Sequence, residues 1–357
     1  MAGFSMVQLQ FMPAAKLAGQ TSLGLGGVLG AACFGAAPPD SLAALDLPLA
    51  CVRVAPLFAG ATPPAAAICE VWTTDAPLRQ GAHGRLRYRC SAEVLFGVLS
   101  IPLADAAPDG AVDNTAPAMQ RAAERAYAEL FAAVGALGFP HLLRVWNHVP
   151  DINGHSAGLE HYHLFNIGRQ DAFLGCDRRI AGASVPAASA LGAQDGSPLV
   201  VYCMAARRPA VALENPRQVS AYDYPRDYGP RAPTFSRASL ARIDGRSVLF
   251  ISGTASIVGH QTLHAGDAAM QTRETLRNIE ALLQQAAGRG AAGLRLEQLH
   301  YKVYVRHAHD LPAARAELER AAGGGARVLY LLADVCRADL LVEIEAVAFP
   351  AEQESPC

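Results

Sequence analysis

The sequence has few lysines and lacks the cysteine spacings that mark a metal or thiol redox motif. Its eight cysteines stand at positions 33, 51, 69, 90, 176, 203, 336 and 357, and no two of them form a C-x-x-C pair. A zinc ribbon and a thioredoxin-type motif are therefore excluded. The N-terminal segment also lacks the charged region and apolar stretch of a secretory signal. We therefore expect reduced cysteines in a cytoplasmic protein.

The sequence also lacks a long run of basic residues. Lys+Arg total 30 against Asp+Glu 32, so the formal net charge is −2, and lysine occurs only at Lys16 and Lys302. Nothing in this balance indicates a nucleic-acid or membrane-surface partner. Residues 23–37 are apolar but too short and too rich in glycine for a membrane span.

The sequence does contain enough apolar residues for a large core. With 357 residues, of which 51% are hydrophobic and 17% charged, it is typical of a folded protein with two domains or one large one. Two segments, 118–151 and 269–310, resemble each other. Each opens with Ala-Met-Gln, continues with the apolar spacing of an amphipathic helix, breaks at glycines and ends in an apolar strand.

Apolar strands flank both segments, so the sequence predicts a duplicated β-β-α-β-β-like module. A chance likeness of two α+β halves remains the alternative. The first copy is expected to carry an insertion from residue 150 to 199. The second copy is preceded by residues 214–238, which are rich in Tyr, Arg and Pro. This segment is expected to form an ordered loop that binds the ligand.

Four histidines gather in one short stretch, namely His148, His155, His161 and His163. A metal site would use His161 and His163 on one strand face, with His155 and a carboxylate from Asp151 or Glu160. The fixed spacings of known metal sites are missing, so structural roles are favoured over a metal site. General-base work by one histidine remains an alternative.

The second half resembles the RidA/YjgF family over residues 228–349. The motifs YGPRAPTFSRA, VLFISGTASI, AMQTRETLRNIEALL, LHYKVYVRH and LVEIEAVA stand in that family's order. The whole chain resembles the chorismatases, which carry a RidA-like C-terminal half behind a degenerate N-terminal half. The stretches RVWNHVPDIN, LFNIGRQDAF, ENPRQVSAYDYPRDYGPR and SGTASIVGH are similar to that family's signatures.

This resemblance implies an α+β fold of two fused RidA/YjgF-like (chorismate-mutase-like) modules, with mixed sheets and long helices packed on one face. We place a degenerate module at 1–216 and the module carrying most of the active site at 217–357. The implied activity removes the enolpyruvyl group of chorismate as pyruvate, with no cofactor or metal. The expected aromatic product is 3-hydroxybenzoate, with 4-hydroxybenzoate or a dihydroxycyclohexadiene carboxylate as alternatives.

Chorismate carries two carboxylates, and planar guanidinium groups bind carboxylates through paired hydrogen bonds. The arginines that we consider for this role are Arg144, Arg208, Arg217, Arg231 and Arg306. Tyr222 and Tyr228 are expected to flank the ring of the substrate. Gly253 and Ala255 are expected to line the pocket floor, where glycine permits close approach of a ligand to the backbone.

Enol ether cleavage needs a carboxylic acid with a raised pKa to protonate the methylene carbon. Glu343 and Glu345 lie two apart on one predicted strand, so both point to the same face. We choose Glu343 as the general acid from its place in the RidA-like motif; two solvated glutamates on an edge strand are the alternative. We expect Cys336 to be a second catalytic residue, whose thiol near the ring helps the branch that gives a hydroxybenzoate. The resemblance implies a cysteine near this position in members that form 3-hydroxybenzoate; the alternative is that Cys336 is a small buried hydrophobic residue.

Two other functions are compatible with the expected fold, namely those of a RidA-type imine deaminase and of a non-enzymatic ligand-binding protein. The long Tyr/Arg loop favours the larger dianionic substrate over a small imino acid. RidA modules are trimers, so a trimer is considered, and a monomer is considered because the duplication can make one interface internal.

Overall fold

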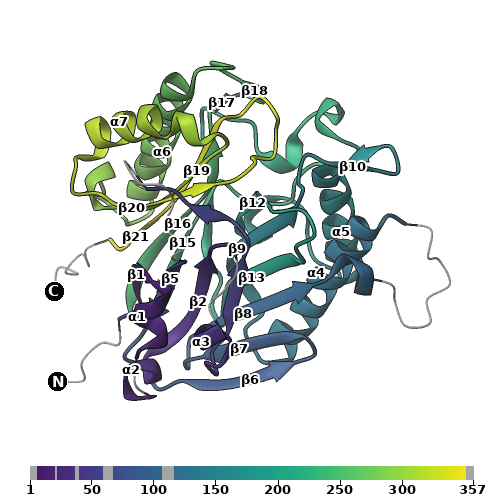
Figure 1. Cartoon of the computed structure of the whole chain (residues 1–357), viewed down its shortest axis with the longest axis vertical. Helices are drawn as coiled ribbons and strands as arrows, with labels where there is room; N and C mark the ends of the chain where they lie inside the picture. The colour runs from purple at the N-terminus through teal and green to yellow at the C-terminus, as the bar shows by residue number, and fades with distance from the viewer. Residues whose placement is uncertain (1–5, 21, 37–39, 59–66, 107–115, 351–357) are drawn as a thin grey trace.

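The structure is a computed structural model that describes residues 6–20, 22–36, 40–58, 67–106 and 116–350. These residues form an α+β fold in which two long mixed sheets and a smaller N-terminal sheet pack together (Figure 1). Cys357 lies outside the described residues, and the seven described cysteines are free.

The first large sheet has the strand order β12-β9-β13-β8-β7-β6. In chain order its strands are β6 Arg79–His83, β7 Leu86–Cys90, β8 Val94–Ile101, β9 His141–Pro150, β12 Ala187–Ala193 and β13 Leu199–Ala206. Helices α4 (Ala118–Ala136) and α5 (His161–Gly175) cover one face, where Tyr127 and Phe165 join the apolar side chains of the strands.

The second large sheet has the order β14-β15-β16-β21-β19-β20-β4. Its strands are β4 Ala55–Pro56, β14 Val211–Leu213, β15 Ala238–Ile243, β16 Arg246–Ala255, β19 His300–Val305, β20 Arg327–Leu332 and β21 Val342–Ala348. Helices α6 (Ala268–Ala287) and α7 (Leu311–Ala322) cover its outer face. Asp267 precedes helix α6, and its side chain accepts a hydrogen bond from the Met270 N–H at 2.9 Å and so caps the helix.

The two sheets share one topology, which confirms the duplicated module. The order β7-β8-β13-β9-β12 in the first half matches β15-β16-β21-β19-β20 in the second. Residues 150–199, expected as an insertion, contain α5 and β12, and these match α7 and β20. The segment therefore contributes regular parts of the module instead of standing outside it. The boundary at 216/217 stays a prediction, and β14, just before it, pairs with β15.

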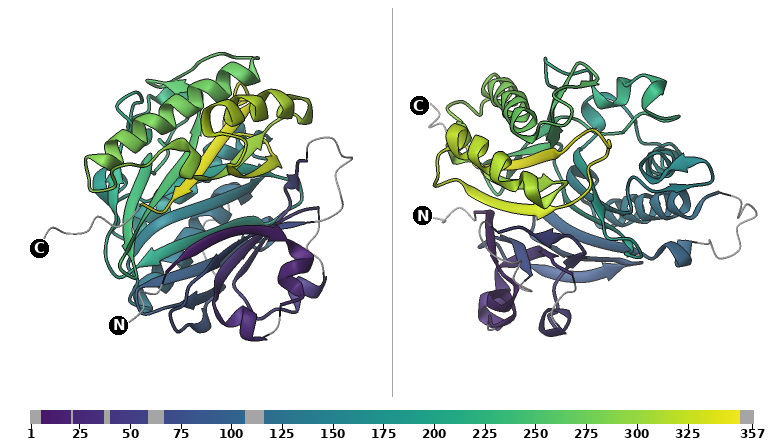
Figure 2. Two further views of the ribbon diagram at one scale, coloured as in Figure 1. Left: turned by 90° about the vertical axis from the view of Figure 1, so that its left-hand side faces the viewer. Right: turned by 45° about the horizontal axis from the view of Figure 1, so that its top comes forward.

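The N-terminal sheet was not foreseen as a separate element. It has the order β1-β5-β2-β3, formed by β1 Gln8–Pro13, β2 Val28–Phe34, β3 Leu49–Val52 and β5 Ile68–Thr73, with short helices α1 Ala14–Ala18, α2 Ser22–Gly26 and α3 Asp40–Ala43. In the right-hand view of Figure 2 it lies at the lower left, beneath the second large sheet. A central core joins all three sheets through side chains such as Trp72, Trp146 and Phe250.

Shorter elements lie in the connections. They are β10 His155–Ser156, β11 Leu159–Glu160, β17 Ile257–Val258, β18 Gln261–Thr262 and the 3₁₀ helices η1 Leu103–Ala106, η2 Gly182–Ser184, η3 Ala221–Asp223, η4 Arg226–Tyr228, η5 Leu296–Gln298 and η6 Ala308–Asp310. Within the described ranges, no helix is long and apolar enough to cross a membrane.

Candidate active site

A cavity of about 570 Å³ lies between the two modules, within the usual size range of small-molecule sites. The first module contributes β11, α5 and β12, and the second contributes β16, β17, β18, β21 and two connecting segments. Side chains or backbone that line it include Tyr162, His163, Arg169, Ser189, Tyr224, Tyr228, Arg237, Gly253, Ala255, Cys336, Arg337 and Glu343.

Glu343 reaches this cavity from β21, where it pairs with Ala255 on one side and Tyr304 on the other. Its side chain is buried, with 4% exposure. Burial, together with the charge of Glu345, raises the pKa of Glu343 to about 8, although Arg144 and Arg237 act in the opposite direction. At neutral pH Glu343 is therefore mostly a neutral carboxylic acid that can give up a proton.

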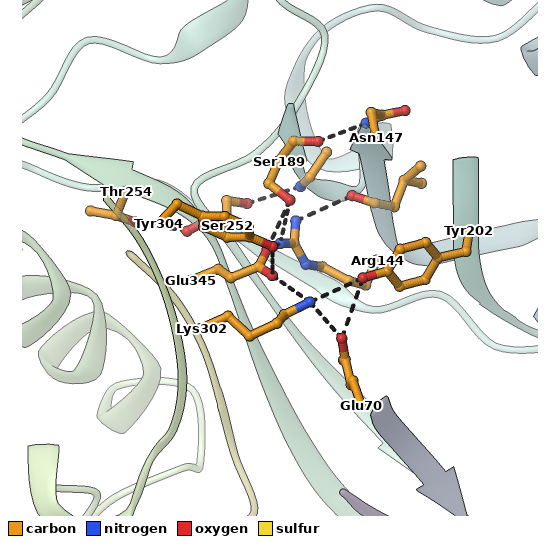
Figure 3. A network of polar contacts seen from close by, with 12 residues as sticks. Glu70, Arg144, Asn147, Ser189, Tyr202, Ser252, Thr254, Lys302, Tyr304 and Glu345 are labelled. Atoms are coloured by element: carbon orange, nitrogen blue, oxygen red, sulfur yellow. Dashed lines mark hydrogen bonds and ion pairs between the residues drawn. The ribbon is translucent and has the colours of Figure 1, made fainter. Parts of the chain in front are cut away.

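Glu345 lies two residues along the same strand and is in the opposite state. Although burial alone would raise its pKa, Lys302 and Arg144 lower it to about 2. The Lys302 Nζ lies 2.5 Å from Glu345 Oε1, and Arg144 forms an ion pair with Oε2 (Figure 3). The surroundings thus shift the pKa values of two glutamates on one strand face in opposite directions, a pattern typical of acid–base sites.

Three arginines line the cavity, and each has one buried nitrogen without a hydrogen-bond partner among the described residues. These atoms are Arg169 Nε, Arg237 Nε and Arg337 Nη2. Arg169 otherwise donates to the Thr234 carbonyl at 2.5 Å, and Arg237 to the Val219 carbonyl at 2.7 Å. Three guanidinium groups at one cavity point to an anionic ligand, because guanidinium groups bind carboxylates through paired hydrogen bonds.

Two tyrosines of the loop 214–238 stand at the cavity beside these arginines. The Arg337 guanidinium carbon lies 3.9 Å from the Tyr228 ring centroid, and the Tyr224 and Tyr228 rings are 5.5 Å apart. Arg237 donates to the Tyr224 hydroxyl at 2.8 Å. The loop therefore lines the cavity, as expected, but with Tyr224 in the place we had given to Tyr222, which is not among the lining residues.

The structure places Gly253, Ala255, Cys336, Tyr228 and Glu343 together around the cavity, as the sequence predicted. It places none of the five predicted arginines there. Arg208 lies at the surface and pairs with Glu93 at 3.0 Å. Arg231 is exposed and faces Asp171 at 3.7 Å.

The other three arginines have their donors occupied by protein groups. Arg144 binds Glu345 and Ser189, and Arg217 binds Glu274 and Asn278. Arg306 donates to Asp334 and Asn153 and to the carbonyls of Val335, Arg337 and Leu340. These three arginines bind protein groups and are not among the residues that line the cavity.

The cavity arginines carried only weak sequence signals. Arg169 stands in the LFNIGRQDAF stretch and Arg337 in the turn before β21, but neither position distinguishes a cavity residue from a structural one. Arg237 follows the serine of TFSRA, within the RidA-like motif. Only the packing of the two modules brings these three positions together.

Cys336 lines the cavity close to Glu343, which supports the expectation that it lies near the reaction. Burial, followed by the neighbouring charge of Glu343, raises the pKa of the Cys336 thiol to about 12. The thiol is therefore protonated at neutral pH and is not a thiolate nucleophile.

The four histidines do not form one site. His148 is buried in the central core, where its ring stacks on Tyr202 with centroids 5.9 Å apart. His161 and His163 begin helix α5, which corrects the expectation of a strand, and only His163 of the four lines the cavity. In the part of the chain that the structure describes, no group of three His, Cys, Asp or Glu side chains is arranged to hold a metal ion.

Comparisons with known proteins agree with this arrangement. Residues 70–205 match the family described as "Chorismatase FkbO/Hyg5-like, N-terminal". A 3-hydroxybenzoate synthase of Streptomyces hygroscopicus is 38% identical over 299 residues, which cover 80% of this chain and 82% of the relative. A chorismatase of Streptomyces rapamycinicus is 39% identical over 291 residues, covering 78% of this chain and 81% of the relative.

A solved structure is similar along its whole length. The crystal structure of a chorismatase superposes with a TM-score of 0.81 at 29% identity, covering 98% of this chain and 100% of that chain. Sequence identity above 30% across most of both chains, together with this likeness, shows that the chain belongs to the chorismatase family.

Proposed function

We propose that this chorismate-cleaving enzyme forms pyruvate and 3-hydroxybenzoate, with Glu343 as the general acid. Membership of the chorismatase family supports cleavage of chorismate, and the relative named 3-hydroxybenzoate synthase supports this product. The observation that carries the assignment of the acid is a buried carboxylic acid facing a cavity lined by three arginines.

The reaction begins when Glu343 donates its proton to the terminal methylene carbon of the enolpyruvyl group. The adjacent ether carbon becomes an oxocarbenium-like centre, which the neighbouring ring hydroxyl attacks. The bond from that hydroxyl oxygen to the ring then breaks, and a ring hydrogen leaves as a proton. The ring becomes aromatic, and the bond between the former ether carbon and the ether oxygen then breaks. The ether oxygen stays on the ring as the phenol and takes the proton of the attacking hydroxyl, while the attacking oxygen leaves in pyruvate, so no water is consumed. The Glu343 carboxylate can accept the released proton and return to its acid form.

The cavity arginines Arg169, Arg237 and Arg337 are proposed to hold the two carboxylates of the substrate. All three residues line the cavity, and guanidinium groups bind carboxylates through paired hydrogen bonds. Tyr224 and Tyr228 provide aromatic surface beside the ring.

Cys336 and Ala255 are proposed to shape the part of the cavity where the oxocarbenium centre forms. The neutral thiol and the methyl group exclude water, so the ring hydroxyl has the advantage as nucleophile. Replacing Cys336 with Ala should shift the products toward the dihydroxycyclohexadiene carboxylate, which needs one water. An unchanged product ratio would remove Cys336 from this role.

The function is tested by incubating the purified protein with chorismate. Pyruvate is measured with lactate dehydrogenase, and the aromatic product is compared by chromatography with authentic 3- and 4-hydroxybenzoate. We expect pyruvate and 3-hydroxybenzoate in equal amounts. Pyruvate with a dihydroxycyclohexadiene carboxylate would replace the proposed product, and absence of pyruvate would reject the activity.

Glu343→Gln tests the acid. The variant should lose turnover by about 100-fold or more, because the amide cannot supply the proton, while chorismate still binds. Glu317→Gln is the matched control, since Glu317 is a buried carboxylate that pairs with Arg273 between α6 and α7. An active Glu343→Gln variant would show that another group donates the proton.

A further inference from the structure

Glu345 is a buried carboxylate behind the cavity that the proposed reaction leaves without a role. It follows Glu343 by two residues on β21, so both side chains project from one face of the strand. Glu343 lines the cavity, whereas Glu345 is 2% exposed and does not line it. A buried charge of this kind is expensive unless several groups stabilise it.

Four side chains stabilise the Glu345 carboxylate. Lys302 and Arg144 provide two positive charges, one from each module. The Ser189 hydroxyl donates to Oε2 at 2.8 Å, and the Tyr304 hydroxyl donates to Oε1 at 2.9 Å (Figure 3). These contacts hold the carboxylate in one place and in its ionised form.

Beyond Lys302, the network continues away from the cavity to Glu70 of the N-terminal sheet. Lys302 Nζ lies 2.5 Å from Glu70 Oε2, and Glu70 accepts a further bond from Trp72 Nε1 at 2.9 Å. The network thus contains two carboxylates, Glu345 and Glu70, and two cations, Lys302 and Arg144. Of the four, only Glu345 lies on the same strand as Glu343. Ser189 is the member that also lines the cavity.

Other groups face Glu343 from every side. Arg144 on β9 and Arg237 before β15 favour its ionised form, and Glu345 opposes it. The Cys336 thiol and the Tyr162 and Tyr304 phenols are buried, and the pKa of each is raised, so they stay neutral at neutral pH. Among these groups Glu345 is the fixed negative charge.

We propose that Glu345 is a positioning residue for the reaction, whose fixed negative charge keeps Glu343 in its acid form. The proposal rests on the proposed function, in which Glu343 is the proton donor. Arg144 and Lys302, which form ion pairs with Glu345, come from β9 of the first large sheet and β19 of the second. The acid therefore depends on the docking of both modules.

Glu345→Gln tests the proposal, with Glu70→Gln as the matched control. Both changes remove a buried carboxylate bound to Lys302, but Glu70 lies on the far side of the lysine. We expect the alkaline fall in kcat to move to lower pH by about one unit in Glu345→Gln, because the nearby negative charge is lost. At pH 8 this shift corresponds to about a fivefold lower rate. Glu70→Gln should keep the wild-type midpoint even if its stability falls.

A double variant covers the case in which Glu345→Gln fails to fold. Lys302→Met with Glu345→Gln removes one charge of each sign, and Glu70 retains its bonds from Trp72 and Tyr202. Its midpoint should still move to lower pH, by less than in Glu345→Gln, because loss of the more distant Lys302 charge acts in the opposite direction. An unchanged midpoint in a folded Glu345 variant, or an equal shift in Glu70→Gln, would overturn the proposal.

Infrared spectroscopy separates this proposal from the proposed function. The band of the protonated Glu343 carboxyl is identified by its loss in Glu343→Gln and followed with pH in wild type and Glu345→Gln. The band should disappear at lower pH in Glu345→Gln, whether or not chorismate is cleaved. If the band titrates alike in both proteins, the proposal fails even when the enzyme is active; if only pyruvate release is absent, the proposed function fails.

Discussion

At the scale of single residues, Gly253 keeps space beside the acid. A methyl group at this position would overlap Glu343 Oε1 and lie 3.1 Å from Ser189 Cβ. The carboxyl end of a glutamate can swing aside, so Gly253→Ala should cost little stability. It should still lower kcat by about 100-fold, because the acid is displaced. Steady-state kinetics with a thermal melt checks both parts, and a normal kcat would show that the carboxyl keeps its place.

His148 makes the folded protein sensitive to acid. Neither ring nitrogen has a hydrogen-bond partner among the described residues, and burial, followed by the charge of Lys302, lowers the pKa of His148 to about 3. The unfolded chain binds the proton near pH 6.5, so stability falls as the pH drops from 6.5 toward 3, by about 2 kcal/mol at pH 5.

His148→Phe should therefore reduce the loss of stability between pH 7 and pH 5. Urea unfolding at both pH values measures this difference, which is insensitive to any packing change that is the same at both. If wild type and variant lose the same free energy of unfolding over that interval, His148 is not the acid-sensitive group.

The positions of the site residues were partly predictable from the sequence. Strand alternation placed Glu343 and Glu345 on one face, and the RidA-like motif singled out Glu343. The arginines could not be assigned in this way, because their partners are distant in sequence: Arg144 meets Glu345, which is 201 positions away. A buried arginine looks the same in a sequence whether it receives a substrate or a neighbouring glutamate.

At the scale of elements, the loop 214–238 is held on the module by Arg217. This residue binds Glu274 and Asn278 of α6, and Asn278 donates to the carbonyls of Ala255 and Ile257 at 3.0 and 2.9 Å. Through these bonds the helix fixes both the loop and the end of β16, where the cavity begins.

Arg217→Met should loosen the loop that carries Tyr224, Tyr228 and Arg237. We expect KM for chorismate to rise about tenfold, with a smaller change in kcat, because charged hydrogen bonds at a partly buried site are lost. Arg208→Met is the control, since Arg208 pairs with Glu93 at the surface. Equal effects of the two substitutions would contradict this role.

The sequence predicted helices and strands correctly where the periodic pattern of apolar residues was long. The helices of 118–151 and 269–310 and the strands around them lie where apolar spacing placed them. The histidine-rich segment was misread, since His161 and His163 begin a helix whose buried face includes Tyr162 and Phe165. Two histidines at alternate positions fit a short strand as well as a helix start, and local pattern does not separate the two.

At the scale of the whole molecule, Trp72 links the three sheets. Its ring, on β5, lies 6.2 Å from Trp146 of β9 and 5.9 Å from Phe250 of β16, and it is fully buried. Trp72→Ala should lower the free energy of unfolding by about 3–5 kcal/mol. Because the sheets share one core, urea unfolding should remain a single transition, and two separate transitions would show that the sheets unfold independently.

The duplication itself was predictable, because both copies keep the same order of helix and strand. The docking of the copies was not predictable, since the contacts between them involve single residues such as Gly192, whose N–H donates to the Asp334 carbonyl at 2.7 Å. The N-terminal sheet was also missed, because its short strands lie outside the repeat and outside the matched motifs.

The shared topology also sets the number of sites. Strand β13 occupies the place of β21 in the first module. On β21, Glu343 pairs with Tyr304 and Glu345 with Lys302 of the neighbouring strand. On β13, Val200 pairs with His148 and Tyr202 with Trp146. Its sequence, LVVYCMAA, contains no carboxylate. With Glu343 as the proposed proton donor, of the two equivalent strands β13 and β21 only β21 carries a carboxylate that can act as the acid. We therefore expect each chain to bind one chorismate, with the first module forming the other side of the cavity.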